Sequence, residues 1–320
     1  MKRFFAGLLC FFTLNSFAQD YPSKPIRMLV PFAPGGAVDT TARVLAQAMQ
    51  QRLSNWQFVI ENRPGGNGFI ATTAVAKSAP DGYTLLMAHT GEFAVNPALF
   101  DNVPYELERD FMPITMVSDS PMLYLATASA PFNNFQELVA QAKAKPGAIS
   151  FGSAGNGSIN HLAGEWLAQA AGIQLLHVPY KGGAPAAAAV AAGDVHFGVM
   201  AAPGAMPHIK SGRGKVIGIT TAKKSPLDPS WATPRDAGIQ DLDASIWVGL
   251  FAPKGTPQAI VDRINKEVRE TLNSPDVKKR FIESAGGEAI GMTPAEILAR
   301  IKADAERYKR VVQKAGVKPG

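Results

Sequence analysis

Two glycine-rich junctions have the residue types and the spacing expected of an anion-binding site. The first reads VPFAPGGAVD over residues 30–39, and the second reads SFGSAGNGS over residues 150–158. Each joins a short apolar segment typical of a strand to a periodic pattern typical of a helix. The unpaired N–H groups and the dipole at a helix start both favour an anion. Two such starts facing each other across a cleft would suit a small carboxylate.

Side chains near predicted strand ends could add contacts, and each also has a structural interpretation. Asp39 could contact an amine or hydroxyl of a ligand, or only stabilise the positive end of its helix. Lys181 could place a positive charge at the mouth of a cleft, or be a solvated loop lysine. His89, beside Thr90, is a candidate for the cleft, whereas His161 by default packs and hydrogen-bonds inside the protein.

A third glycine-rich turn and several hydroxyl groups lie at the same kind of position. The turn over residues 62–68 follows another predicted strand, and its sequence fits a binding role or a structural one. Ser153, Ser158 and Tyr180 offer hydroxyl groups near strand ends. Open α/β sheets bind ligands at the carboxyl ends of their strands, so these groups belong to the candidate site.

Patterns for metal, cofactor or covalent chemistry are missing from the sequence. The five histidines form no compact metal motif, and no His-Glu-x-x-His occurs. There is no P-loop and no Gly-x-Ser-x-Gly elbow, and no predicted strand-to-helix turn completes Gly-x-Gly-x-x-Gly. The basic residues behind the net charge of +6 are dispersed. We therefore predict no metal, no cofactor, no catalytic residue and no nucleic-acid partner.

The N-terminal residues are typical of a secretory signal peptide. Lys2 and Arg3 precede an apolar stretch, and the residues SFA at 16–18 fit the small-x-small cleavage pattern. Cleavage there would remove residues 1–18 together with Cys10, the single cysteine, which leaves no disulfide or thiol chemistry. A cysteine-free exported protein fits a bacterial periplasm.

Strands and helices alternate along the rest of the chain, which predicts an α/β fold. The length of 320 residues suits two domains, and no apolar run is long enough to cross a bilayer. The chain ends in helices that lack a sheet of their own, so we expect them to cover the first sheet. The first lobe would then be discontinuous, residues 20–121 plus 246–320, and the second lobe would be residues 122–245. Two chain crossings between the lobes would act as a hinge.

The pattern places the elements as follows. The predicted strands are 26–32, 58–61, 83–88, 122–127, 149–151, 174–178, 195–200, 215–220 and 245–252. The predicted helices are 38–53, 69–77, 135–144 with Asn134 as N-cap, 160–170, 185–192, and three more that begin at Thr256-Pro257, Ser274-Pro275 and Thr293-Pro294. Glu296 completes a capping box in the last of them.

Ordered motifs run along the whole mature chain. They include PFAPGG at 31–36, ENRPGGNG at 61–68, PDGYTL at 80–85, GSAG at 152–155, VPYKGG at 178–183 and WVGL at 247–250. In this order they resemble the Bug proteins, the extracytoplasmic solute receptors of tripartite tricarboxylate transporters. The resemblance implies a type II periplasmic-binding-protein fold, with two α/β lobes around a central cleft.

The resemblance also implies how a ligand would be held and passed on. A ligand carboxylate would lie against the loops after the first strands, partly through ordered waters. The protein would deliver it to membrane subunits of a tripartite tricarboxylate transporter or to a sensor kinase, and we expect a monomer. The predicted ligand-binding residues are Phe32, Ala33, Pro34, Gly35, Gly36, Ala37, Val38, Asp39, His89, Thr90, Ser153, Ala154, Gly155, Gly157, Ser158, His161, Tyr180, Lys181 and Gly182.

Two departures from the family pattern predict an apolar pocket. Val38 stands where the family often has Thr or Ser, and MAAP at 200–203 replaces a segment that often carries polar side chains. We therefore expect a ligand with a hydrophobic or aromatic body behind its carboxylate. The alternative function is an exported α/β hydrolase acting on carboxylate esters, for which Ser153 or Ser158 near His161 is the conceivable nucleophile–base pair.

Overall fold

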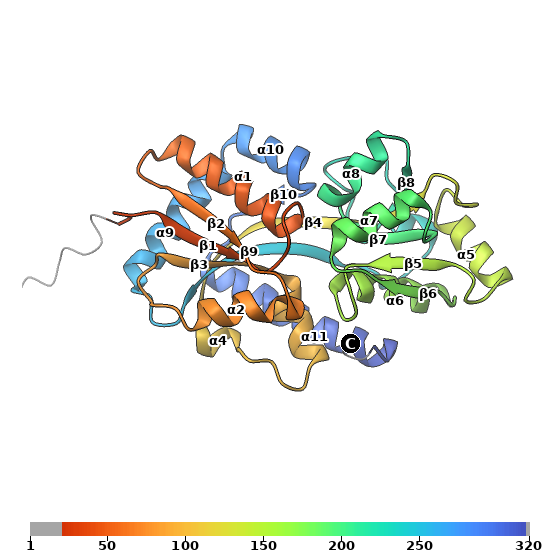
Figure 1. The fold of residues 1–320 in the computed structure, drawn as a ribbon, viewed down its shortest axis with the longest axis horizontal. Coiled ribbons are helices and arrows are strands. Elements are labelled where there is room, and N and C mark those ends of the chain that lie inside the picture. The colour runs from red at the N-terminus through yellow and green to blue at the C-terminus, as the bar shows by residue number, and fades with distance from the viewer. Residues whose placement is uncertain (1–20, 318–320) are drawn as a thin grey trace, which may run out of the picture.

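Two long strands connect the two halves of the molecule in the computed structural model, which describes residues 21–317. They are β4 (Phe111–Thr127) and β9 (Ser245–Pro253), and Figure 1 shows both running from one half to the other. Residues 111–121 of β4 pair antiparallel with β9. Residues 122–127 pair antiparallel with β7 (Phe197–Ala201) and β8 (Gly214–Ile219). One strand therefore belongs to the sheets of both lobes.

The first lobe is built on parallel strands from the N-terminal part of the chain. Its elements are β1 (Ile26–Val30), α1 (Ala37–Arg52), β2 (Phe58–Asn62), η1 (Gly66–Gly68), α2 (Phe69–Ala76), β3 (Thr84–His89), η2 (Gly91–Val95), α3 (Asn96–Leu99), α4 (Leu107–Asp110), α9 (Gln258–Leu272), α10 (Pro275–Ala285), β10 (Glu288–Ala289) and α11 (Pro294–Ala315). The strand order is β2-β1-β3-β9-β4, with β9 antiparallel to β3. α1 and α10 cover one side of this sheet and α2 and α11 the other, which buries β1 and β3 (Figure 1).

The second lobe repeats the same principle with shorter strands. Its elements are α5 (Phe135–Ala144), β5 (Ser150–Ser153), α6 (Ile159–Ala171), β6 (Leu176–Pro179), α7 (Gly183–Ala192), β7, α8 (Ala202–Lys210), β8 and η3 (Arg235–Ala237). β5 is parallel to β6 and to β7, and β7 joins this group to β4. The predicted two-lobed α/β fold is thus confirmed.

The predicted signal peptide, residues 1–18, and Cys10 lie outside the described residues. Within residues 21–317, no helix combines the length and the apolar character that a membrane crossing requires.

β4 is the element that the sequence pattern predicts least well. The pattern places a strand only at 122–127, whereas the observed strand begins at Phe111. Polar residues and Pro113 and Pro121 interrupt the apolar run upstream, which is unusual inside a sheet. The register against β9 shifts at two places in this segment, so irregular pairing accommodates residues that a regular central strand would exclude.

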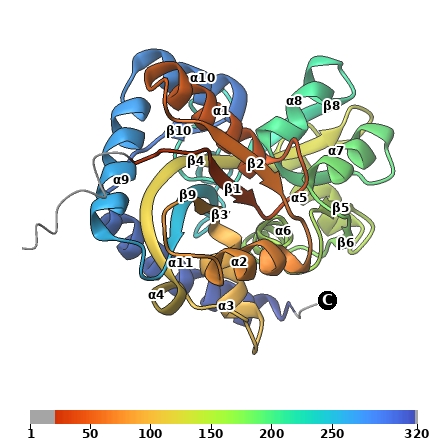
Figure 2. The ribbon, with the colours of Figure 1, turned by 60° about the vertical axis from the view of Figure 1, so that its left-hand side comes forward.

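The C-terminal helices pack against the first lobe, and the last one also reaches the second. α9 and α10 contact α1, as Figure 2 shows, and α11 contacts β4, η2 and α6. Trp166 of α6 and Tyr308 of α11 meet edge to face, with ring centroids 6.4 Å apart. α11 therefore joins the two lobes through its contacts with β4 and η2 on one side and α6 on the other.

Of the four capped helix starts that the sequence predicts, three are correct and one is shifted. Ser274 is the N-cap of α10, with Pro275 at the first helical position. Asn134 accepts a hydrogen bond from the Glu137 N–H, and Thr293 forms a reciprocal capping box with Glu296. α9 begins one residue later than predicted, with Pro257 as N-cap, because the Thr256 hydroxyl donates to the Pro253 carbonyl instead. α8 was not predicted, since its prolines obscure the helical pattern.

A cluster of charges lies where β4, β9 and α11 meet. The buried Asp304 carboxylate accepts hydrogen bonds from Trp247 Nε1 at 2.9 Å, Arg300 Nε at 2.9 Å and Arg307 Nη2 at 2.8 Å. Arg300 Nη2 also bonds Asp119 Oδ2 of β4 at 3.2 Å. Burial raises the pKa of the Asp119 carboxyl, while Arg300 opposes that rise. The cluster ties α11 to both crossing strands.

Removing Asp304 should destabilise the whole fold. Asp304→Ala leaves the Trp247 N–H without its acceptor and two arginines without their counter-charge. We expect the free energy of unfolding to fall by about 3 kcal/mol, at the lower end for a broken buried ion pair because both arginines keep some solvent contact. Urea denaturation measures this. Lys302→Ala on the same helix, which removes an exposed pair with Glu108, should change it by less than about 0.5 kcal/mol.

Candidate functional site

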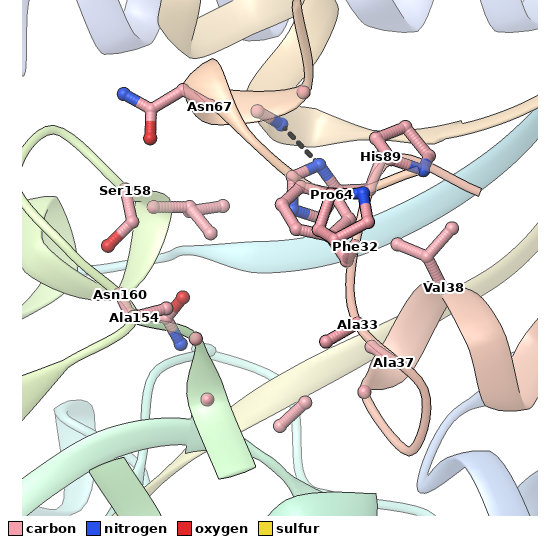
Figure 3. Close-up of a pocket in the computed structure, with 18 of the residues that line it drawn as sticks. Phe32, Ala33, Ala37, Val38, Pro64, Asn67, His89, Ala154, Ser158 and Asn160 are labelled. Carbon is pink, nitrogen blue, oxygen red and sulfur yellow. Dashed lines mark hydrogen bonds between the residues drawn. The ribbon is translucent and has the colours of Figure 1, made fainter. Parts of the chain in front are cut away.

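A cavity of about 580 Å³ lies between the two lobes. The residues around it come from loops after β1, β2, β3, β5 and β6, from the end of β7, and from Ile246 at the start of β9 (Figure 3). Most of them are glycine, alanine, proline or larger apolar residues. Lys181 and His89 are the basic residues on this wall, among the residues that the structure describes. The cavity therefore offers a ligand mainly backbone groups and carbon.

Both glycine-rich junctions contribute to the cavity wall. The predicted binding residues found on it are Phe32, Ala33, Pro34, Gly36, Ala37, Val38, His89, Ala154, Gly157, Ser158, Lys181 and Gly182. Their contact with a ligand stays a prediction, but the structure does bring these segments, distant in the chain, to one place.

The starts of several helices supply hydrogen-bond donors to this wall. Gly36 precedes α1 and Gly182 precedes α7, and neither has a side chain that could occupy the N–H groups of the first turn. Gly36 and Gly182 themselves line the cavity, followed by residues of the first turns. At α6, by contrast, the Ser158 hydroxyl accepts the His161 N–H. The first turns of α1 and α7 are thus two places where backbone donors remain available for an anion.

Asp39 and Gly35 are predicted site residues that lie behind the wall. The Asp39 carboxylate is buried and accepts hydrogen bonds from the Gly35 N–H at 2.9 Å, Arg43 Nε at 3.0 Å and Asn62 Nδ2 at 2.9 Å. Burial raises the pKa of Asp39, but these bonds, led by the one from Arg43, outweigh it and hold the pKa below its ordinary value. Asp39 therefore fixes the shape of the first junction.

Thr90 and Ser153 are also behind the wall, where their hydroxyl groups are already bonded. The Thr90 hydroxyl donates to the Ser245 carbonyl at 3.2 Å and accepts the Trp247 N–H at 3.1 Å, so it joins the end of β3 to β9. Ser153 is fully buried, and its Oγ lies 3.1 Å from both the N and the O of Gly155. These contacts hold the turn that carries Gly155, which itself does not line the cavity.

His161 and Tyr180 support the second junction from below. His161 Nδ1 accepts the Gly157 N–H at 3.1 Å, and its ring stacks on His177 with centroids 3.7 Å apart. His177 Nε2 is 2.7 Å from Ser153 Oγ. Tyr180 packs over Gly152, where an added Cβ would come within 3.2 Å of its ring. The default interpretation of His161 as a packed, hydrogen-bonded side chain agrees with this geometry.

Several wall residues are not in the predicted set. They are Pro31, Pro64, Gly65, Gly66, Asn67, Gly68, Gly91, Asn96, Ile159, Asn160, Gly183, Ala184, Pro185, Met200, Ala201, Gly204 and Ile246. The turn at 62–68 has a visible glycine signal that fits two roles, and its residues 64–68 lie on the wall. Asn96 and Asn160 give no such signal, because nothing in local spacing shows that an amide within a helix faces a cavity.

The two lobes touch across the mouth of the cavity. Asn67 Nδ2 of the first lobe donates to the Asn156 carbonyl of the second at 3.4 Å, and Leu99 packs against Gly157 so closely that an added Cβ would lie 2.2 Å from it. Asn67 has a left-handed backbone, φ 48°, which a non-glycine residue adopts at a cost. Asn96 Nδ2 donates to the Asn67 carbonyl at 2.9 Å and helps to hold this conformation.

His89 forms a close pair with a buried carboxylate. Glu92 is fully buried, and its Oε2 lies 2.8 Å from His89 Nδ1 and accepts the His89 N–H at 2.8 Å. The Gly91 N–H approaches the same Nδ1 at 2.9 Å, which is the dashed line in Figure 3. The His89 ring packs against Phe32 with centroids 4.5 Å apart. Hydrogen bonds to its near neighbours in the chain, Gly91 and Glu92, thus hold His89 in the cavity wall.

The arrangement offers little for metal binding or covalent catalysis. Among residues 21–317, no three His, Cys, Asp or Glu side chains are grouped as metal ligands would be. Ser153, one of the two conceivable nucleophiles, is sealed from the cavity. Ser158 Oγ donates to the Gly155 carbonyl and contacts the His161 backbone N–H rather than its ring. What the site can do is hold a small molecule through backbone donors.

Comparison with known proteins agrees with this two-lobed binding architecture. A family model described as "Tripartite tricarboxylate transporter family receptor" matches residues 41–317. Protein BugT of Bordetella pertussis is 35% identical over 302 residues, which cover 94% of this chain and 92% of BugT. The structure of the R. palustris protein Rpa4515 with adipate has 31% identity and a TM-score of 0.89, and covers 94% of this chain and 100% of that one. The periplasmic binding protein BugD has 36% identity and a TM-score of 0.84, with 93% and 99% covered.

The fold and the cavity define a solute-binding protein with two α/β lobes. The chain belongs to the tripartite tricarboxylate transporter receptor family, and the predicted resemblance to the Bug proteins is confirmed.

The histidine stack below the second junction should make stability depend on pH. Burial, helped by His161, lowers the pKa of His177 to about 4. The unfolded chain then binds more protons than the folded one, so stability is complete above the ordinary histidine pKa and falls as pH drops from about 6.5 toward 4. Allowing for partial solvent screening, we expect a loss of about 1 kcal/mol between pH 6.5 and 5. Urea denaturation at several pH values tests this, and His177→Asn should flatten the profile; equal slopes in both proteins would contradict it.

Proposed function

We propose that this protein is an exported receptor that captures a small organic carboxylate with an apolar body in the cavity between its lobes. It would deliver that ligand to the membrane subunits of a tripartite tricarboxylate transporter, or to a sensor kinase. The observation that carries the proposal is the convergence of uncapped helix starts on one largely apolar cavity. Backbone donors at helix starts bind carboxylates without needing a counter-charge.

The composition of the wall favours a ligand with few charged groups for its number of carbon atoms. Val38, Met200 and Ala201, at the positions where the chain departs from the family pattern, all line the cavity. Lys181 and His89 are the basic side chains available on the described wall, which favours one or two carboxylates over three. The volume lies in the usual range for small-molecule sites. Adipate, found with the R. palustris relative, is a linear dicarboxylate with an apolar middle and fits this chemistry.

The receptor performs no reaction in this proposal. Its relatives are described as receptors and binding proteins, and the sealed Ser153 argues against the hydrolase alternative. We place it in the periplasm as a monomer, after removal of residues 1–18. Its ligand would be enclosed as the lobe of residues 20–121 plus 246–320 closes on the lobe of residues 122–245. The change of partners in β4 after Pro121 supports a hinge at this boundary.

Thermal unfolding of the mature protein against a panel of acids tests the proposed function. The panel should contain adipate, malate, citrate, aspartate, benzoate and nicotinate. A ligand that binds only the folded state raises stability by about 2.7 kcal/mol at one hundred times its Kd, which shifts the melting temperature by several degrees. We expect shifts from acids with an apolar body and little or none from citrate. Binding of citrate or aspartate alone would contradict the apolar-body proposal, and mass spectrometry of the denatured protein would reveal a ligand retained from purification.

A larger side chain at Gly36 should weaken binding without disturbing the fold. Gly36 has an ordinary φ of −83°, and an added Cβ would find only the Ala33 carbonyl within 4 Å. Gly36→Val should therefore fold normally yet keep a carboxylate away from the first turn of α1, lowering adipate affinity at least tenfold, about 1.4 kcal/mol. Calorimetric titration measures the loss. Ala170→Val on the exposed face of α6 is the control, and unchanged affinity in Gly36→Val would remove the first junction from the site.

The contact between Asn67 and Asn156 should contribute to closure. Asn67→Gly keeps the left-handed backbone accessible and deletes the amide that crosses the mouth. We expect affinity for adipate to fall about fivefold, as for the loss of one hydrogen bond. Asn156→Ala is the matched control, because the acceptor is the main-chain carbonyl, and should bind as the parent does. Equal affinities of all three proteins would show that this contact does not stabilise the bound form.

A further inference from the structure

His89 Nδ1 lies within hydrogen-bond distance of two groups, the Gly91 N–H and the Glu92 carboxylate, and it cannot bond both in one protonation state unless the carboxyl group is protonated. His89 Nδ1 lies 2.9 Å from the Gly91 N–H and 2.8 Å from Glu92 Oε2. If Nδ1 carries a proton it can donate to the carboxylate, and Gly91 then loses its acceptor. If Nδ1 is bare it can accept from Gly91, and the contact with Glu92 then requires a proton on the carboxyl group. The position of one proton therefore decides the state of the pair.

The Glu92 carboxylate has few hydrogen-bond or ionic partners besides His89. It is fully buried, and its Oε1 has no hydrogen-bond partner among the described residues. Oε1 lies under the backbone of Gly68, where an added Cβ would be only 2.3 Å away. Within residues 21–317, the basic side chain in contact with the Glu92 carboxylate is His89, which carries a charge only when it is protonated. A carboxylate in such surroundings is sensitive to any further negative charge brought close to it.

The neighbouring titratable and charged groups do not supply the missing charge. The Tyr105 hydroxyl donates to the Glu92 carbonyl, and burial raises the pKa of Tyr105, so it stays neutral. Asp39 in the first junction is neutralised by Arg43. Phe32, Asn96 and the backbone of Gly68 complete the surroundings without a charge. Lys181 lines the cavity from the second lobe and is exposed to solvent.

We propose that binding of a carboxylate in the cavity is coupled to the uptake of one proton by the His89–Glu92 pair. This inference rests on the proposed function of the cavity. The two ring nitrogens of His89 and the Glu92 carboxylate can share one or two protons. With one proton, His89 is neutral, and the proton is best placed on Nδ1, facing the ionised Glu92. His89 Nε2 is then a bare acceptor that repels an anion. With two protons, Nε2–H is present whether the second proton resides on Nδ1 or on Glu92. His89 then donates to the ligand, and the pair is neutral overall.

The coupling makes affinity depend on pH in a defined direction. Because the liganded form holds the extra proton more tightly, binding is strongest at low pH and weakens as pH rises. The affinity falls by at most tenfold per pH unit, the limit for one proton. The proton comes from solvent, so its uptake appears as heat from the buffer.

Calorimetric titration of the mature protein with adipate, malate and benzoate at pH 7 and pH 8, in phosphate and in Tris, tests the proposal. These buffers differ in ionisation enthalpy, so the difference in heat gives the number of protons taken up per ligand. We expect uptake that approaches one proton at the higher pH for each acid that binds. Binding without proton uptake overturns this inference alone. No binding of any of the three acids, by heat or by thermal shift, overturns the proposed function and this inference with it.

Variants assign the proton to the pair. His89→Asn should abolish the uptake, and Glu92→Gln should move it to lower pH, because the histidine loses its counter-charge. His208→Gln, which changes a histidine of α8 that does not line the cavity, should leave the uptake unchanged. Unaltered uptake in His89→Asn would contradict the assignment. The wild-type measurement decides the coupling itself even if either variant fails to fold.

Discussion

The antiparallel pairing of β4 with β9 is the constraint on which the rest of the structure depends. β4 is continuous across the boundary between the lobes and exchanges β9 for β7 and β8 after Pro121. The cavity exists because the sheets of the two lobes share β4 while their βα loops face each other. Asp304, bonded to Trp247 and to Arg300 and Arg307, secures the same crossing from the side of α11. The strand pairing and the Asp304 cluster, both outside the cavity wall, thus determine the geometry of the site.

The candidate site relies on backbone groups and is supported by polar side chains that it does not expose. Asp39 shapes the first junction. Beneath the second junction, Ser153 is hydrogen-bonded to His177, and the His177 ring stacks on His161, which accepts the Gly157 N–H. Buried polar groups with satisfied hydrogen bonds make loops rigid, which keeps the helix-start donors in place before a ligand arrives. In the proposed function, the apolar wall would select among carboxylates, because an unpaired polar group on the ligand would lose its water without compensation.

Much of the architecture could be predicted from the sequence because its signals are local. Alternating apolar periodicities place most strands and helices, and Asn134 and Thr293 mark helix starts through their own hydrogen bonds. β4 escapes this kind of reasoning, since its residues before Met122 pair irregularly and carry prolines and polar side chains. α8 escapes it because proline suppresses the pattern in a short helix whose stability comes from packing.

The sequence by itself determined the family, the α/β class and the glycine-rich junctions, because each depends on residue types at short, fixed spacings. Only the tertiary structure decided which candidates line the cavity. Asp39, Thr90 and His161 have the chemistry of binding residues, yet their polar atoms are bonded behind the wall. Asn67 acquires its role from Asn96 and Asn156, which are far away in the chain. The direction of a polar side chain depends on which groups hydrogen-bond its atoms, and long-range packing determines which groups lie within reach.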